Sequence, residues 1–182
     1  MPHAPFRPRI YLAGPDVFLP ASAARFLALR AACERHALVG LEPSDGDLPA
    51  DFRGSDDARA QRIYEGNIRR IQQSDGVLAN LCDFRGLEPD SGTVFEIGYA
   101  VALGKPVAAY GVPPGTYAQR VSAVHPSAPD ALGVLRENGS GLMVEGLGQR
   151  LNLMLARSAH LAPTEEEALA HLAAHFAALP HP

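Results

Sequence analysis

The segment EPDSGTVFEIGYAVALG, residues 88–104, places two carboxylates next to a strongly apolar helical pattern. Glu96 stands between Phe95 and Ile97, and Asp90 comes just before the predicted start of the helix. Burying an unpaired carboxylate is costly, so an acid in this position needs either a partner or a task. The segment therefore identifies Glu96 as a candidate for chemistry and Asp90 as a possible second acid.

The helical positions around Glu96 leave space beside its side chain. The residues three and four positions away are mostly small: Gly92, Thr93, Tyr99 and Ala100. The bulkier apolar residues of the helix cover its other faces: Val94, Ile97, Val101 and Leu103. Two further interpretations stay open, namely an ion pair of Glu96 with an arginine such as Arg85, or a helix that is more exposed than its pattern indicates.

The chemistry that suits a desolvated, oriented carboxylate is attack on carbon. Such a group can form an ester with an anomeric carbon while a second acid assists the leaving group, as in retaining glycoside cleavage. Asp75 and Asp90 are the available second acids. Neither GxxxxGK[ST] nor GxGxxG occurs in the chain, which argues against phosphoryl transfer and dinucleotide binding.

Short apolar runs alternate with longer amphipathic ones, which predicts an α/β fold with a parallel sheet covered by helices. We expect strands over residues 9–14, 38–43, 76–81 and 106–111, and a short fifth strand over 141–146. We expect helices over 22–37 and 58–73, from about Ser91, over 147–160, and from Thr164, where Glu167 completes a capping box. Residues 112–141 are rich in Pro, Gly and Ser and are predicted to be a loop.

In an open α/β sheet, ligands bind beyond the carboxyl ends of the strands. The residues predicted to lie there are 14–16, 80–90 and Gly111, while Tyr11 lies inside the first strand. Asp75 precedes the third strand, and because Asp-Gly often marks a turn, the pattern alone favours a turn residue at this position.

Composition limits the other possibilities. A chain of 182 residues with 47% hydrophobic residues predicts a single domain over 1–182, in which 159–182 form a C-terminal helical extension. The formal charge of -4 comes without a basic stripe, which argues against nucleic-acid binding. No apolar signal region or membrane-spanning run occurs, and Cys33 and Cys82 are expected to be reduced, so we expect a cytoplasmic protein without a membrane partner. His171 and His175 lack the Glu of HExxH and a third ligand, so we predict a solvated helix face and no metal.

Three separated motifs carry a family resemblance. They are IYLAGPDVF (residues 10–18), SDGVLANLCDFRGLEPDSGTVFEIGYAVALGKPVAAY (74–110) and LNLMLARS (151–158). Together, in order from about Arg9 to Ser158, they resemble the nucleoside 2-deoxyribosyltransferases. The resemblance implies a flavodoxin-like, doubly wound parallel sheet of five strands with helices on both faces. It also implies a ping-pong exchange of 2-deoxyribose between 2-deoxyribonucleosides and free nucleobases, with no cofactor.

The same resemblance assigns roles to individual residues. Glu96 corresponds to the nucleophile and Tyr11 to the tyrosine that orients it. Asp75 corresponds to an acid near the nucleobase, which replaces the turn interpretation, and Asp90 to an acid that holds the deoxyribose. The substrate site further includes Gly14, Gly92 and the aromatic Phe18.

Two residues of the third motif imply an assembly. Asn152 and Met154 correspond to residues that reach into the site of a neighbouring subunit, so the resemblance implies a homo-oligomer. Without it, LNLML is an ordinary amphipathic helix.

Two alternative functions remain. Related deoxynucleoside monophosphate N-glycosidases carry a loop with Ser and Arg after the first strand that holds the 5′-phosphate. Here that loop reads AGPDVF, where Asp16 is expected to repel an anion, which favours an unphosphorylated nucleoside. Hydrolysis nevertheless differs from transfer only in the acceptor, and a non-catalytic nucleotide-binding module of the same fold is the other alternative.

Overall fold

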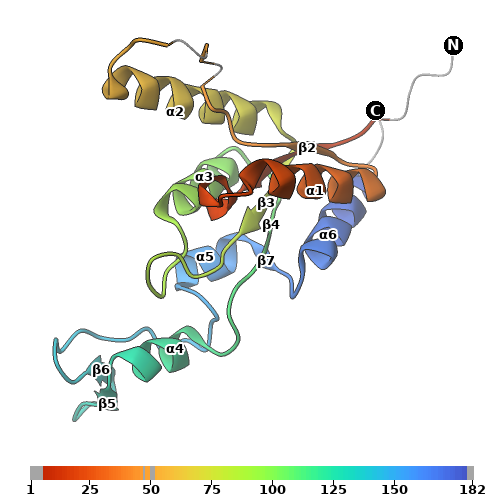
Figure 1. The fold of residues 1–182 in the computed structure, drawn as a ribbon. Helices are drawn as coiled ribbons and strands as arrows, with labels where there is room; N and C mark the ends of the chain where they lie inside the picture. Colours follow the sequence, from red (N-terminus) through yellow and green to blue (C-terminus); the bar gives the residue numbers. More distant parts are fainter. Residues whose placement is uncertain (1–5, 47, 50–51, 180–182) are drawn as a thin grey trace, which may run out of the picture.

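A sheet of five parallel strands forms the centre of the computed structural model, which describes residues 6–46, 48–49 and 52–179 (Figure 1). The strand order is β2-β1-β3-β4-β7. The strands are β1 (Arg9–Ala13), β2 (Val39–Leu41), β3 (Gly76–Asn80), β4 (Val107–Tyr110) and β7 (His160–Leu161). This is the doubly wound, flavodoxin-like order, so the predicted fold class is confirmed.

Helices cover both faces of the sheet and enclose one hydrophobic cluster on each side. Helices α1 (Ser22–Arg35) and α6 (Glu165–Ala177) contribute to one cluster. Helices α2 (Asp56–Gln73), α3 (Ser91–Ala102) and α5 (Leu153–Ser158) contribute to the other. Each helix therefore buries one apolar side against the strands, as the amphipathic patterns predict.

The alternation of side chains along β1 decides which residues can meet α3. Ile10 and Leu12 belong to the cluster under α1 and α6, whereas Tyr11 and Ala13 belong to the cluster under α2, α3 and α5. Because successive side chains of a strand point to opposite faces, Tyr11 is directed toward α3. This places its phenol on the same face of the sheet as Glu96.

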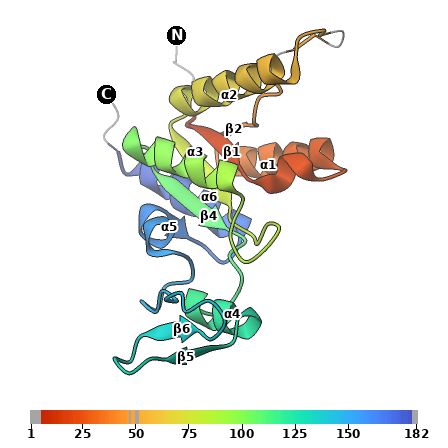
Figure 2. The same ribbon diagram turned by 90° about the vertical axis from the view of Figure 1, so that its left-hand side faces the viewer.

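The chain between β4 and α5 differs from the prediction. Within 112–141, expected to be a loop, the structure has α4 (Tyr117–Val124) and an antiparallel pair formed by β5 (Ser127–Pro129) and β6 (Leu135–Glu137). Figure 2 shows this part extending away from the sheet. A capping box at Thr116 and Gln119 starts α4, a signal that the Pro and Gly content obscured.

The fifth strand also lies elsewhere than predicted. Residues 141–146 form no strand of the main sheet, and Met143 makes only an isolated bridge to Arg136. The edge position is taken by β7, which pairs with β4 over two residues. A strand this short has no alternation that a sequence pattern could reveal.

The segment expected to be a C-terminal extension is part of the main fold. It supplies β7 and α6, and Leu169 and Leu172 of α6 are fully buried. Among the described residues, no helix is long and apolar enough to cross a membrane. Residues 1–5, part of the segment without an apolar signal region, and residues 180–182 lie outside the described residues. Cys33 and Cys82 are both free thiols.

A buried ionic network joins α6 to the turn after β1. Asp16, 4% exposed, accepts hydrogen bonds from Arg25 Nε at 2.9 Å and from Asn80 Nδ2 at 3.0 Å. Arg25 Nη2 also donates to Glu165 Oε2 at 2.6 Å and to the Tyr110 hydroxyl at 2.7 Å. The guanidinium thus connects α1, α6, β4 and the turn after β1, and it neutralises a carboxylate that is almost fully buried.

Replacing Arg25 tests the weight of this network. Arg25→Met leaves the buried carboxylate of Asp16 without its cation, so the free energy of unfolding should fall by about 2 to 4 kcal/mol. Arg30→Met is the matched control, because Arg30 lies on the same helix as Arg25 but pairs with Glu42 in an exposed position. Its loss should cost less than about 1 kcal/mol. Urea unfolding of both variants measures the difference; equal losses would contradict the assignment.

Candidate active site

Glu96 and Tyr11 are joined by a short hydrogen bond at the carboxyl-terminal side of the sheet. The Tyr11 hydroxyl donates to Glu96 Oε1 at 2.5 Å. Tyr11 is fully buried in β1, while Glu96 is half-buried and lies beside the core-facing residues Thr93, Ile97 and Ala100 of α3. The phenol therefore fixes one carboxylate oxygen and leaves Oε2 for a ligand.

Burial raises the pKa of both partners. Desolvation, together with the charge of Asp90, raises the pKa of Glu96 to about 7, although the hydrogen bond from Tyr11 lowers it. Burial, with the neighbouring Glu96 charge, raises the pKa of Tyr11 well above its usual range. Tyr11 therefore remains a hydrogen-bond donor throughout the neutral range, while Glu96 changes its charge within it.

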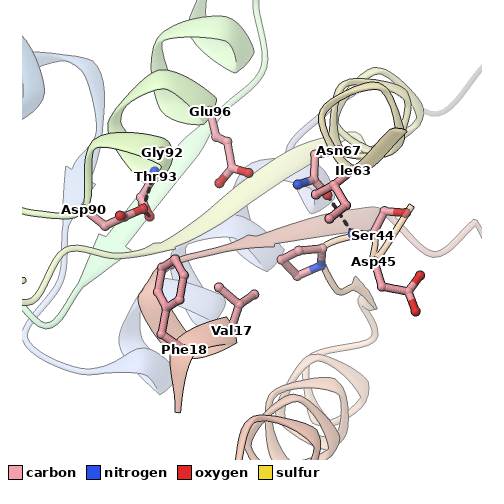
Figure 3. A pocket seen from close by; sticks show the side chains of 12 residues that line it. Val17, Phe18, Ser44, Asp45, Ile63, Asn67, Asp90, Gly92, Thr93 and Glu96 are labelled. Atoms are coloured by element: carbon pink, nitrogen blue, oxygen red, sulfur yellow. Dashed lines mark hydrogen bonds between the residues drawn. The ribbon is translucent and has the colours of Figure 1, made fainter. Parts of the chain in front are cut away.

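A cavity of about 440 Å³ lies beside Glu96 (Figure 3). Five predicted site residues line it: Gly14, Phe18, Asp90, Gly92 and Glu96. Gly14 follows β1, and Phe18 ends the short 3-10 helix η1 (Pro15–Phe18). Asp90 and Gly92 lie at the start of α3, and Glu96 lies in the middle of this helix. The cavity thus lies beyond the carboxyl end of β1, on the side of the sheet where ligands bind in this type of fold.

Asp90 is held rigidly at the N-terminus of α3. Its Oδ2 accepts hydrogen bonds from the Thr93 backbone N at 2.9 Å and from Thr93 Oγ1 at 3.0 Å. This is the N-cap arrangement, which satisfies a backbone donor that the helix leaves unpaired. Because both bonds use one oxygen, the orientation of the carboxylate beside the cavity is fixed.

One wall of the cavity was not identified from the sequence. It consists of Pro43, Ser44 and Asp45 from the loop after β2, with Ile63 and Asn67 from α2. Asn67 Oδ1 accepts a hydrogen bond from the Ser44 backbone N at 2.6 Å, and its amide nitrogen points toward the cavity (Figure 3). The signal was available, since β2 is parallel to β1 and the loop that follows it must leave the sheet at the same edge.

The structure does not support the predicted role of Asp75 near the nucleobase. Its carboxylate accepts a hydrogen bond from the Arg9 backbone N at 2.7 Å, at the start of β1. The five residues of β3 separate this end of the sheet from the cavity, a span of ~16 Å. Asp75 therefore connects the start of β3 to the start of β1, which is closer to the turn interpretation.

Asn152 and Met154 line another cavity, of about 540 Å³, between α3 and α5. Asn152 is the N-cap of α5: its Oδ1 accepts from the Met154 backbone N at 3.0 Å, and its Nδ2 donates to Glu145 at 3.1 Å. Met154 is 71% exposed. Neither residue lines the cavity of Glu96 in the same chain.

Two charged residues, Arg85 and Asp16, make other contacts than the sequence indicated. Arg85 does not pair with Glu96, because its guanidinium lies over the Phe84 ring at 4.6 Å, so the expected ion pair between these two residues does not form. Asp16 does not line the Glu96 cavity, because it turns inward to Arg25. It is therefore not the group that would repel a substrate anion.

The histidines of α6 make a contact that the sequence did not indicate. His171 stacks on His160 of β7 with ring centroids 3.6 Å apart. Over residues 6–46, 48–49 and 52–179, no group of three or more His, Cys, Asp or Glu residues could hold a metal ion.

Comparison with known proteins decides the family. The model of the nucleoside 2-deoxyribosyltransferase family matches residues 10–154. The chain belongs to this family. It is also 31% identical over 144 residues to an uncharacterised protein of Schizosaccharomyces pombe, covering 78% of this chain and 68% of that protein.

Solved structures agree with the assignment of this nucleoside 2-deoxyribosyltransferase family member. The 2-deoxyribosyltransferase from Leishmania mexicana is 31% identical, with a TM-score of 0.72, covering 92% of this chain and 98% of that one. A conserved protein from Enterococcus faecalis V583, 21% identical with a TM-score of 0.60 over 93% and 99% of the two chains, shares the fold. The family implies nucleoside and nucleobase substrates and an enzyme of the deoxyribosyltransferase or glycosidase kind.

The hydrogen bond between Tyr11 and Glu96 can be tested through the pKa of the carboxyl group. Because the bond favours the charged form, Tyr11→Phe should raise the pKa of Glu96 above about 7. Carboxyl ¹³C resonances followed over a pH titration measure this, with assignment by Glu96→Gln. Tyr99→Phe is the control, since the Tyr99 hydroxyl accepts a hydrogen bond from Gln72 and not from a group near Glu96. This variant should leave the pKa of Glu96 unchanged. An unchanged or lower pKa in Tyr11→Phe would show that the bond does not act on Glu96.

Proposed function

We propose that the protein transfers 2-deoxyribose from one nucleobase to another through a covalent intermediate on Glu96, with water as a slow alternative acceptor. The observation that supports this best is the pairing of Glu96 with Tyr11 at the edge of a cavity that also presents Asp90 and Phe18. A carboxylate that is half-buried, oriented by a phenol and open to a cavity has the properties of a nucleophile.

In the first half of the reaction, Glu96 Oε2 attacks the anomeric carbon of the nucleoside. The bond between carbon and nitrogen breaks, its electron pair stays with the nucleobase, and the base takes up a proton from solvent. Tyr11 holds the other carboxylate oxygen, so the attacking oxygen is presented in one orientation. A sugar without a 2-hydroxyl forms the oxocarbenium-like transition state more readily, which suits capture by a carboxylate.

In the second half, another nucleobase attacks the same carbon through a ring nitrogen. The ester bond breaks, its electron pair returns to Glu96, and the nitrogen releases its proton to solvent. Asp90 accepts a hydrogen bond from a sugar hydroxyl, and the Phe18 ring contacts the base. Asn67 donates a hydrogen bond to the base from its amide; an amide does not release a proton, so it orients the base without acting as an acid.

The charges around the cavity favour a neutral substrate. Among the described residues that line it, Asp45, Asp90 and Glu96 are acidic and none is basic. A 5′-phosphate would bring at least one further negative charge, and none of the described lining residues is basic and could pair with it. We therefore favour the unphosphorylated nucleoside, for a different reason from the one that the sequence suggested at Asp16.

Substituting Glu96 tests the reaction. The wild-type protein, incubated with 2-deoxyinosine or thymidine and a second free base, should produce a new deoxynucleoside detectable by chromatography. Glu96→Gln keeps the size of the side chain and an acceptor for Tyr11 but removes the nucleophile, so exchange should fall by at least about 10³-fold. Asp75→Asn is the control and should retain exchange, because Asp75 lies at the amino-terminal end of β3, away from the cavity. Free base without a new deoxynucleoside would indicate a hydrolase, and normal turnover by Glu96→Gln would refute the nucleophile.

The active form is a homo-oligomer in which Asn152 and Met154 complete the site of a neighbouring chain. Supporting this, both residues lie in a groove of their own with Val94, Ile97 and Val101 of α3, and not in the Glu96 cavity. The groove has a mostly apolar lining, and Met154 extends from it into solvent. A second copy that covered this groove would bury apolar surface and bring Asn152 near another chain's cavity.

Complementation between two inactive variants tests this arrangement. Glu96→Gln lacks the nucleophile, and Asn152→Ser shortens the side chain while keeping a residue that can cap α5. Purified hetero-oligomers of the two should recover exchange, because one site then combines an intact Glu96 with an intact Asn152 from the other chain. Light scattering checks assembly; hetero-oligomers of the expected size that are as inactive as their parents would show that each chain builds its own site.

A further inference from the structure

The ring of Phe18 stands at the mouth of the cavity and is supported from outside it. Phe18 lines the cavity on the opposite side from Glu96 (Figure 3). It is 59% exposed, yet it stacks on Phe84 with ring centroids 5.3 Å apart and an angle of 22° between the planes. An exposed phenylalanine has little packing of its own, so Phe84 is the contact that limits its motion.

Phe84 belongs to a loop, residues 81–90, that is fastened at several points. The Phe84 backbone N donates to Glu88 O at 2.9 Å and closes the loop on itself. Asp83 pairs with Arg120 of α4 at 2.8 Å, and the Tyr117 hydroxyl donates to Glu88 at 2.5 Å. The loop therefore offers Phe18 a fixed platform rather than a free end.

Arg85 covers the same pair of rings. Its guanidinium carbon lies 4.6 Å from the centre of the Phe84 ring and 5.6 Å from that of Phe18. Its backbone is in the left-handed region, with φ of 56°, a conformation that a long side chain adopts at a cost. The strained turn directs the cation over both rings, where it attracts their π faces.

We propose that Phe84 and Arg85 hold Phe18 in place as a wall of the cavity and so make a nucleobase, rather than water, the preferred acceptor of the sugar. This inference rests on the function proposed above. Both acceptors attack the same carbon: a ring nitrogen or a water oxygen forms the new bond, the ester electron pair returns to Glu96, and the acceptor's proton goes to solvent. A fixed aromatic face stacks a planar base and restricts the approach of water, so it acts on the second half of the reaction.

Two variants test the inference by the partition of products. Phe84→Ala removes the platform, and Arg85→Asn removes the cation with a residue that tolerates the left-handed backbone. Each should raise the ratio of hydrolysis to transfer, and the KM for the acceptor base, by about 2- to 10-fold. The rate at which the donor nucleoside is cleaved at saturation should stay near the wild-type rate, because Glu96 and Tyr11 are untouched.

The control is Tyr64→Ala, which removes an exposed ring that pairs with Phe95 away from the cavity and should leave the partition unchanged. Circular dichroism checks that each variant is folded. Wild-type exchange with an unaltered partition in both variants would overturn this inference alone. A wild-type protein that neither transfers nor hydrolyses would overturn it together with the proposed function.

Discussion

The site depends on one carboxylate that is drawn out of water but kept beside a cavity. Glu96 lies on the border between the buried side of α3 and the cavity, and the phenol of Tyr11 is the donor that meets it there. The geometry exists because side chains alternate along β1, which turns Tyr11 to the face that α3 covers. Burial raises the pKa of Glu96 to about 7, so its ionised form is poorly solvated and reactive while still accessible near neutral pH.

The turn after β1 must hold its shape for this carboxylate to be useful. It carries Gly14 and Phe18 on the cavity side and Asp16 on the inner side. An added side chain at Gly14 would meet Asp16 Oδ2 at 2.7 Å and the Asn80 Cβ at 2.9 Å, so this position requires glycine. Arg25 then connects the turn to Glu165 of α6, which makes the last helix of the chain part of the support for the site.

Two cavities lie beside α3: one is the candidate active site, and the other is the groove that we propose contacts a neighbouring chain. One side of the helix presents Glu96 to a cavity with acidic residues in its lining, and the other lines a largely apolar groove with Asn152 and Met154. Met154 is exposed on a short helix, so its side chain contributes little to the stability of a single chain. Because α3 carries Glu96 and also lines the groove, assembly through this groove would be linked directly to the position of the nucleophile.

Much of this was determined by the sequence itself. The apolar periodicity gave the parallel sheet and most of its helices, the three motifs gave the family, and the small neighbours of Glu96 indicated a carboxylate with space beside it. These features are local, since they depend on residues within a turn or a strand of one another. The same local information suggested correctly that Asp75 is a turn residue, although the family resemblance replaced that interpretation.

Which distant residues meet depends on the packing of the whole chain. Asn67 and the loop after β2 form a wall of the cavity because β2 lies beside β1, a neighbour relation that no short pattern encodes. The two-residue edge strand β7 and the burial of Asp16 against Arg25 likewise follow from pairing and packing across the whole chain. A sequence specifies the chemical groups and their local spacing, whereas long-range packing sets the burial, and with it the charge state and reactivity, of each group.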